Sequence, residues 1–473
     1  RLKVLPEPVL KQQISKLDRT VKPDSTGRMD FVAPIPQKQT LSNGLGITII
    51  EKPGMPVVSF AVVFGSGTTS DPQNLAGLSS FTAQMLTEGT QSKSSQEIAE
   101  AFEYIGSRLN TETRRESTVF STETLTKHWP TALALLADIL RFPTFPQDEF
   151  ERVQREHLTD LMRAKDDPTF ISEQNMSALI FGKDSGYGHP AHGTEESVRA
   201  FRREDLLEHF ESQYAPDIAN LIVAGDVSCA EVVDLAENIF KSWSNRSQHN
   251  EIPDPKNYNE SERPSTVFLI DKPGAAQSVI RAGHVTVPRD HEDYFSLQIL
   301  NFIFGGQFSA RLNQNLRQDK GYSYGFHSSI SWYKDQSMIV AGGSVQTDVT
   351  KESVIEVFRE FSDITHIRPI TEDELVSAQG GLLQGYPSGF ERSGQILGKL
   401  IQLVTWDRPD DYFSTLPSEL QKITLSDIHR VGLSRINQDG LSVLVVGDRE
   451  RIEEGLRTLD VPLVLLDVNG DAI

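Results

Sequence analysis

The sequence predicts an α+β protein built from two homologous domains, each with a mixed or antiparallel β-sheet packed with helices. The first observation is an internal repeat, in which "ITIIEKPGMPVVSFAVVF", starting at Ile47, is similar to "TVFLIDKPGAAQSVIRAGHV", starting at Thr266. The second is that "NLIVAGDVS" at Asn220 is similar to "LSVLVVGDRE" at Leu441. Lys-Pro-Gly thus recurs after 220 residues and Gly-Asp after 222. Two landmarks at nearly one offset indicate a duplicated module.

The elements of each module follow from local patterns. Apolar, β-branched runs before Lys-Pro-Gly and Gly-Asp are typical of strands. The segment "SSQEIAEAFEYIGSRLN" is predicted to be a helix, because Ser94 can cap its start and Ile98, Phe102 and Ile105 share one face. A second helix is predicted in "TALALLADILRF", with a stripe of Leu133, Leu136 and Leu140. We expect both stripes to lie in the core.

The repeat also predicts how the chain is divided. We expect a polar leader at residues 1–40 and an N-terminal domain at 41–243. A linker rich in Pro, Asn and charge is expected at 244–265, followed by the C-terminal domain at 266–473.

Composition excludes several classes of protein. The 473 residues are 38% hydrophobic and 24% charged, as in a globular chain, and no apolar run reaches the ~18 residues of a membrane span. The net charge of −20 disfavours nucleic acid as a partner. Cys229 is the single cysteine, so no internal disulfide can form.

The first residues bear on localisation. The sequence starts at Arg1 without Met and continues as a polar, Pro-punctuated leader that lacks an apolar signal core. We expect a removed targeting segment or a trimmed start, which favours a bacterial cell envelope or periplasm. The cytoplasm and the mitochondrial matrix remain open, as does a lipid tether before Arg1.

The stretch Gly77–Thr90, "GLSSFTAQMLTEGT", combines an apolar frame with small polar residues. It follows the predicted strand "SFAVVFGSG" and the polar loop "TTSDPQN". A helix is predicted from about Leu75 to Gly89, where glycine ends it.

This stretch, together with the repeat, resembles the pitrilysin-type zinc peptidases. Their inverted motif H-x-x-E-H lies on such a helix, in a segment like G-L-A-H-F-L-E-H-M-L-F-K-G-T. The resemblance puts the first His at Ser80, the Glu at Ala83 and the second His at Gln84. It puts the third ligand, a Glu in the family, at Asp160 in "REHLTDLMRAKDDP".

The lost residues predict lost chemistry. Histidines at i and i+4 share a helix face and can reach one metal, and the Glu takes a proton from the metal-bound water. Ser80 and Gln84 are poor zinc ligands, and Ala83 cannot move a proton. Other histidines, at 157, 189 and 192, supply no third ligand at a recognisable spacing. We therefore expect no metal in this chain.

The second half keeps a different set. The stretch "NFIFGGQFSARLNQNLRQDKGYSYGFHSSISW" resembles the family segment F-G-G-G-x-S-S-R-L-x-x-x-L-R-E-x-x-G-L-A-Y. The resemblance implies that Arg317 and Tyr324 bind substrate backbone at a zinc site and stabilise the tetrahedral intermediate. Gly305 and Gly306 are predicted to form a tight turn that allows close backbone approach to substrate.

Each of the two polar residues has a plainer interpretation. Arg317 could form a surface salt bridge with Asp319 or a neighbouring residue, and Tyr324 could be a half-buried strand residue.

The leading hypothesis is a zinc-free, non-catalytic subunit, inactive alone, of a heterodimeric zinc endopeptidase. It would form half of a clam-shell chamber for extended peptides, and a homologous partner bearing H-x-x-E-H would contribute the zinc. The division of labour is that of the mitochondrial processing peptidase, although the short "FGGQFSARL" favours a bacterial heterodimer. The alternatives are a scaffold protein like the core subunits of respiratory complexes and a stand-alone peptide-binding homodimer.

Overall fold

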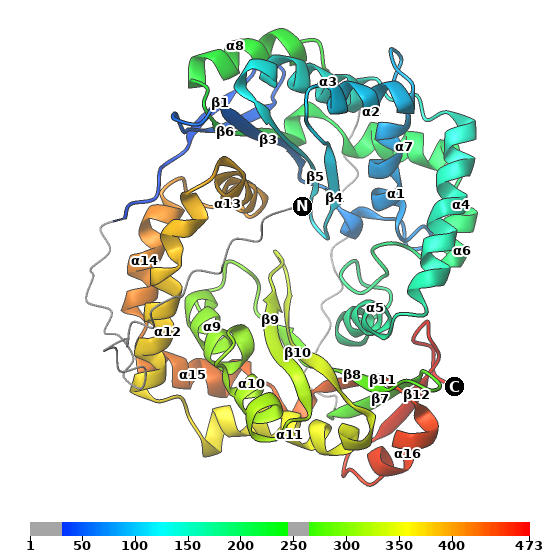
Figure 1. Cartoon of the computed structure of the whole chain (residues 1–473), viewed down its shortest axis with the longest axis vertical. Coiled ribbons are helices and arrows are strands. Elements are labelled where there is room, and N and C mark those ends of the chain that lie inside the picture. Colours follow the sequence, from blue (N-terminus) through cyan, green and yellow to red (C-terminus); the bar gives the residue numbers. More distant parts are fainter. Residues whose placement is uncertain (1–30, 245–263) are drawn as a thin grey trace, which may run out of the picture. The chain divides into compact units, whose positions relative to one another are not determined.

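Within the described residues, 31–244 and 264–473, each half of the chain folds around a six-stranded mixed β-sheet (Figure 1), which confirms the predicted α+β class. The structure is a computed structural model, and its described residues from Ala33 onward form one compact unit. Most of the predicted leader and linker lies outside the described residues. The N-terminal sheet has the order β1 (Gln37–Thr40), β2 (Gly46–Glu51), β6 (Ala219–Gly225), β3 (Val57–Phe64), β5 (Thr118–Leu125), β4 (Asn110–Thr113). The C-terminal sheet has the order β12 (Leu463–Leu466), β7 (Thr266–Asp271), β11 (Ser442–Gly447), β8 (Gln277–Thr286), β10 (Ser337–Gln346), β9 (Ser323–Ser331).

The two landmarks of the repeat are neighbouring strands. β2 and β6 pair in parallel with Glu51 opposite Gly225, and β7 and β11 pair in parallel with Asp271 opposite Gly447. The remaining strand pairs are antiparallel, except that β12 runs parallel to β7. One edge differs between the halves, because β1 comes from the end of the predicted leader, which thus joins the N-terminal sheet, whereas β12 comes from the end of the second module. The opposite edges, β4 and β9, correspond.

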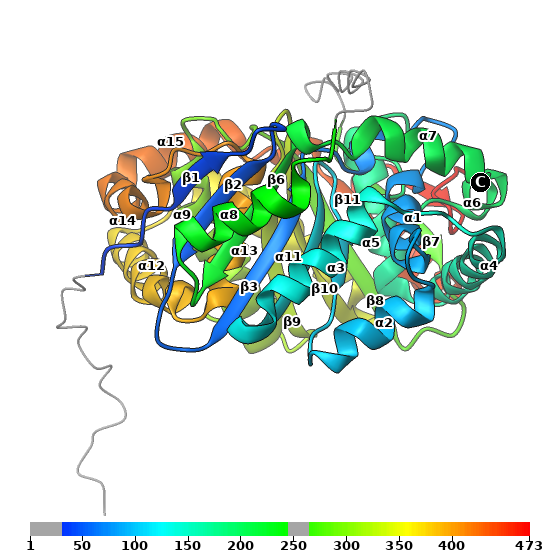
Figure 2. The ribbon, with the colours of Figure 1, turned by 90° about the horizontal axis from the view of Figure 1, so that it is seen from above.

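Helices cover the N-terminal sheet, and the hydrophobic core of this half lies between them and the sheet. Figure 2 shows α8 and α3 lying over this sheet. The apolar residues predicted to share one face of α2 and of α3 are buried, as expected. α2 begins with a capping box between Ser94 and Glu97. The helices of this half are α1 (Leu78–Met85), α2 (Ser95–Tyr104), α3 (Trp129–Arg141), α4 (Gln147–Ala164), α5 (Pro168–Phe181), α6 (Glu195–Ala200), α7 (Arg203–Gln213) and α8 (Cys229–Phe240).

The C-terminal half repeats this plan with additional π-helical turns. Its helices are α9 (Tyr294–Asn301), α10 (Arg311–Asn313), α11 (Thr350–Ser362), α12 (Glu372–Gln384), α13 (Ser393–Thr405), α14 (Tyr412–Lys422), α15 (Leu425–Arg435) and α16 (Arg449–Arg457). π-Helical turns span Phe302–Gly306, Gln314–Asp319 and Asp363–Ile367. Among the described residues, no helix is both long and apolar enough to cross a bilayer.

The two halves exchange one helix each. α5, from the N-terminal half, packs on β8 and β11, where Ile171, Met176 and Ile180 join a cluster with Leu444 and Val446. α13, from the C-terminal half, packs on β3 and β6. Each sheet is therefore covered on one face by a helix of the other half.

Candidate functional site

The helix that carries the degenerate motif is α1, Leu78–Met85, and it begins later than the predicted start at Leu75. Gly77 has a left-handed backbone with φ of 89°, which ends any helical path before it. The Asp71 carboxylate then caps the helix, accepting hydrogen bonds from Gly77 N at 2.8 Å and Ser79 N at 2.7 Å. The cap comes from several residues upstream, so the local sequence pattern missed it.

The three motif positions on α1 have different surroundings. The Ser80 hydroxyl donates a hydrogen bond to the Ala191 carbonyl at 2.8 Å. Gln84, one turn further on the same face, is exposed. Ala83 is wholly buried in the hydrophobic core. Of these three motif positions, Ser80 and Gln84 line the cavity beside this helix, and Ala83 does not.

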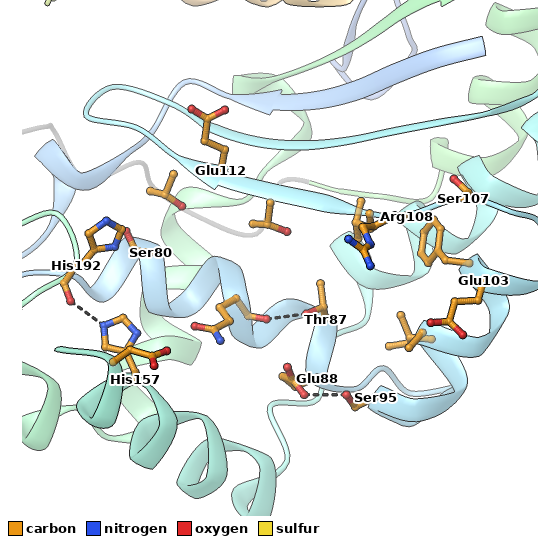
Figure 3. A pocket seen from close by; sticks show the side chains of 18 of the residues that line it. Ser80, Thr87, Glu88, Ser95, Glu103, Ser107, Arg108, Glu112, His157 and His192 are labelled. Atoms are coloured by element: carbon orange, nitrogen blue, oxygen red, sulfur yellow. Dashed lines mark hydrogen bonds between the residues drawn. The ribbon is translucent and has the colours of Figure 1, made fainter. Parts of the chain in front are cut away.

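The predicted third ligand position does reach the same cavity. Asp160 lies on α4, with its carboxylate largely exposed and 3.7 Å from Arg163. His157, one turn before it, lies with Nε2 2.8 Å from the His192 carbonyl oxygen (Figure 3). Burial, followed by the charges of His157 and Arg115, lowers the pKa of His192. The fold thus brings together the positions that the resemblance matched to ligands.

These side chains do not fit a zinc ion. The Ser80 hydroxyl and the His157 Nε2 are engaged by backbone carbonyls, which leaves the Gln84 amide, the Asp160 carboxylate and the His157 Nδ1 at these positions; only the last two are usual zinc ligands. Zinc in proteins takes thiolate, imidazole and carboxylate ligands, at least three from the protein. Within the described part of the chain, no three His, Cys, Asp or Glu side chains are grouped so as to hold a metal. His189 instead lies 3.4 Å from the buried Asp71 carboxylate.

A cavity of about 1090 Å³ lies between α1, α2, α4 and β4 (Figure 3). Its apolar lining includes Ile98, Phe102, Leu109, Leu161 and Phe170. The charged side chains that line it are Glu88, Glu103, Arg108, Glu112 and Asp160. Glu88 is paired with Arg152, and Glu112 with Arg114. The lining from α2 and β4 was missed, because only the tertiary fold brings these segments to α1.

The cavity borders a free strand edge. β4 is the last strand of its sheet, and no described strand pairs with its outer side. Arg114 N donates to Ser117 O at 2.8 Å, so in antiparallel alternation the pairs at Glu112 and Asn110 are also hydrogen-bonded. Thr111 and Thr113 consequently present their backbone groups to the open edge, where an extended peptide could pair.

Gly305 and Gly306 end the π-helical turn Phe302–Gly306, so the predicted tight turn is wrong. Gly305 is buried, and a Cβ there would lie 2.4 Å from the backbone nitrogen of Ser328. The close backbone approach at Gly305 is therefore made by the protein's own strand β9, and a substrate role of this glycine stays a prediction. Gly306 is exposed, and its substrate role stays a prediction.

Arg317 lies on the π-helical turn Gln314–Asp319 and has no carboxylate partner among the described residues. No ion pair joins Arg317 to Asp319 or to another carboxylate of the described residues, so the salt-bridge interpretation is wrong; Asp319 instead accepts a hydrogen bond from the Gln314 amide at 2.9 Å. The guanidinium carbon is instead 5.1 Å from the ring centroid of Tyr324. The two residues singled out by the resemblance are thus in contact.

Tyr324 is 88% exposed on edge strand β9, so the half-buried interpretation is also wrong. In the pairing of β9 with β10, Phe326 lies opposite Gly343 and Ser323 opposite Val345. Two residues of β9, Tyr324 and Gly325, therefore oppose one residue of β10, which is a β-bulge. Bulges redirect side chains and are frequent beside active sites.

Comparison with known proteins gives the family. Residues 47–185 match the profile described as Insulinase (Peptidase family M16), and residues 200–382 match the profile described as Peptidase M16 inactive domain. The "Uncharacterized zinc protease YmxG" of Bacillus subtilis is 30% identical over 307 residues, covering 65% of this chain and 73% of the relative.

Two further similarities agree. The "Non-peptidase homolog YmxG" of Helicobacter pylori is 23% identical, over 82% of this chain and 88% of the relative. The crystal structure of a peptidase M16 inactive domain from Pseudomonas fluorescens superposes with a TM-score of 0.80 at 21% identity, covering 87% of this chain and 98% of that one. The chain therefore belongs to the pitrilysin-type zinc peptidases, peptidase family M16.

Proposed function

We propose that this chain is the zinc-free, non-catalytic subunit of a heterodimeric zinc endopeptidase that acts on extended peptides. Arg317 and Tyr324 would serve the zinc site of a homologous partner that carries an intact H-x-x-E-H motif. The observation that carries the proposal is that these two donors touch one another while Tyr324 is exposed and Arg317 has no carboxylate partner in the described chain.

The proposed absence of catalysis by this chain alone has separate support. Ser80 and His157 are already bonded to carbonyls, and Ala83 is buried where a catalytic base would be needed. The match of residues 200–382 to an M16 inactive domain agrees with this, as does the relative whose name describes a non-peptidase homolog.

The chemistry suits a site that is shared between subunits. The partner's zinc would polarise the scissile carbonyl and activate a water molecule. Arg317 and Tyr324 would donate hydrogen bonds to the same carbonyl oxygen as negative charge develops on it. Because the guanidinium already contacts the tyrosine ring, little reorganisation is needed when the peptide binds.

The proposed class of substrate is supported by features of the N-terminal half. The open edge of β4 offers the backbone groups of Thr111 and Thr113 to an extended peptide. Glu103 and Asp160 line the adjoining cavity beside its apolar floor. A peptide with both basic and apolar side chains is the ligand that this lining favours.

The test is a peptidase assay on a quenched fluorescent basic peptide with three samples: this chain alone, the H-x-x-E-H subunit of the same organism alone, and both mixed. We expect activity only in the mixture, with one zinc per complex that the partner brings. An active partner alone, unchanged by this chain, would contradict the proposal and favour the scaffold alternative.

A further inference from the structure

The Arg317 guanidinium lies close to two aromatic rings. Its carbon is 4.4 Å from the ring centroid of Phe308 and 5.1 Å from that of Tyr324. Phe308 precedes α10 and is 62% exposed. A phenylalanine this exposed keeps much of its apolar surface in water, although the guanidinium can attract the face of the ring. No pattern in the sequence pointed to this residue.

The loop that carries Phe308 is anchored to the strand that carries Tyr324. The fully buried amide of Asn313 donates from Nδ2 to the Phe308 carbonyl at 2.6 Å. Its Oδ1 accepts a hydrogen bond from the backbone nitrogen of Phe326 at 3.2 Å. One side chain therefore connects the Phe308 backbone to β9, so Phe308 keeps a defined position relative to Tyr324.

The bulge at Tyr324 is held by a side chain as well. The Ser323 hydroxyl accepts a hydrogen bond from Gly325 N at 3.1 Å and lies 2.7 Å from the Ser344 carbonyl oxygen, to which it can donate. It thereby satisfies backbone groups that the bulge removes from the ladder. Phe308, Arg317 and Tyr324 thus come from three segments that are fixed against one another.

We propose that Phe308 is a third residue of the Arg317 and Tyr324 site, with two roles that rest on the proposed function. Its ring positions the guanidinium, and its exposed surface contacts a large apolar side chain of the bound peptide next to the cleaved bond. The ligand class is an extended peptide with leucine, phenylalanine or a similar residue at that position. Burial of the ring by the peptide would strengthen the attraction between ring and guanidinium, because water is excluded.

The experiment uses the mixed complex and two quenched peptides that differ only in Leu or Ser beside the cleaved bond. Phe308→Ala should raise KM for the Leu peptide about tenfold, the scale of one buried apolar contact. It should also lower kcat for both peptides several-fold. Phe308→Leu should restore KM but not kcat, because leucine is apolar yet has no ring. Ile367→Ala, at a site that is 74% exposed in the same half, is the matched control and should change neither constant.

A second readout needs no partner. A 19F signal from 4-fluorophenylalanine in place of Phe308 should move on Arg317→Gln and stay fixed on Arg359→Gln, a half-exposed arginine on α11. A signal that ignores Arg317 would overturn the positioning role.

Three results, two from the kinetics and one from sedimentation of the complex, would overturn the inference in different ways. Unchanged kcat and unchanged preference in Phe308→Ala, with kcat lowered in Arg317→Ala, would remove only the role of Phe308. Unchanged kcat in both variants would remove the proposed function itself. A complex that fails to assemble with Phe308→Ala, measured by sedimentation, would make Phe308 a contact to the partner instead.

Discussion

The motif helix of the N-terminal half and the segment from Phe302 to Tyr324 of the C-terminal half have kept different parts of the family pattern. In α1 and directly after it, the matched residues Phe81, Met85 and Leu86 are wholly buried, so the part of the pattern kept there is packing. In the C-terminal segment the donors Arg317 and Tyr324 remain and reach the surface. The residues that hold an element in a fold are thus separable from those that perform chemistry on it.

The same separation is visible inside the C-terminal segment. Phe304, Leu312 and Leu316 belong to the core, which explains their match without reference to substrate. Arg311 is engaged by Glu374 through two hydrogen bonds of 2.8 and 2.7 Å. A match to a family segment therefore indicates a functional residue only where no structural task accounts for it.

The largest effect on stability is expected when a charged side chain is introduced into the buried face of α1. Ala83→Glu would bury a carboxylate without a partner and should lower the free energy of unfolding by about 3–5 kcal/mol. The neighbouring Gln84→Glu, at an exposed position, should change it by less than about 0.5 kcal/mol. Urea denaturation of the two variants measures the difference. Equal stability would mean that α1 is not packed as described.

A smaller loss is expected from the glycine next to the donor segment. Gly305→Ala would put a methyl group 2.4 Å from Ser328 N, and overpacking of this kind costs about 1–3 kcal/mol. Gly380→Ala, inside α12 with open space around it, should instead gain up to about 1 kcal/mol. Thermal unfolding of both variants checks the sign. Stabilisation by Gly305→Ala would contradict the close approach of β9.

The pH dependence of stability gives the smallest of these effects. Burial acts to raise the pKa of the Glu374 carboxyl, but hydrogen bonds from Arg311 and Thr371 hold it at about 2. Because the folded pKa is lowered, its stabilisation is complete above the unfolded pKa, near 4.3, and is lost as pH falls toward 2. Allowing for solvent screening at this partly exposed carboxylate, Glu374→Gln should cost about 1–2 kcal/mol at pH 7.

The comparison for this prediction is Glu372→Gln in the exposed first turn of the same helix, which should cost less than about 0.5 kcal/mol. Denaturation curves between pH 7 and pH 2 should converge for Glu374→Gln and the unmodified chain. Curves that stay parallel would mean that Arg311 does not stabilise the ionised carboxylate.

Much of the fold could be predicted because it is written in local patterns. The β-branched runs and the Lys-Pro-Gly and Gly-Asp landmarks predicted strands β2, β6, β7 and β11, and these pair with one another in both halves. The start of α1 was misjudged, because the Asp71 carboxylate that caps it lies outside the helix. The π-helical turn at Gly305 was misjudged, because the local sequence does not show how closely β9 approaches this glycine.

The candidate site was predictable only in part. The resemblance identified Arg317 and Tyr324, but their mutual contact depends on a bulge in β9 that no local pattern indicates. Phe308 could not be predicted as a site residue, because the residue type alone does not tell an exposed ring from a buried one. The cavity lining from α2 and β4 likewise requires the tertiary fold.

The central claim is that Arg317 and Tyr324 serve the partner's zinc site. Its most direct test is to measure kcat of the assembled complex, with its zinc content determined, when this chain carries Arg317→Ala or Tyr324→Phe. Each change should lower kcat about 10²-fold, the scale of losing one oxyanion donor, while the complex still forms with one zinc. Arg359→Ala, on α11, serves as the control and should leave kcat unchanged. If both variants retain full kcat in an intact complex, this chain lends no chemistry to its partner and the claim is wrong.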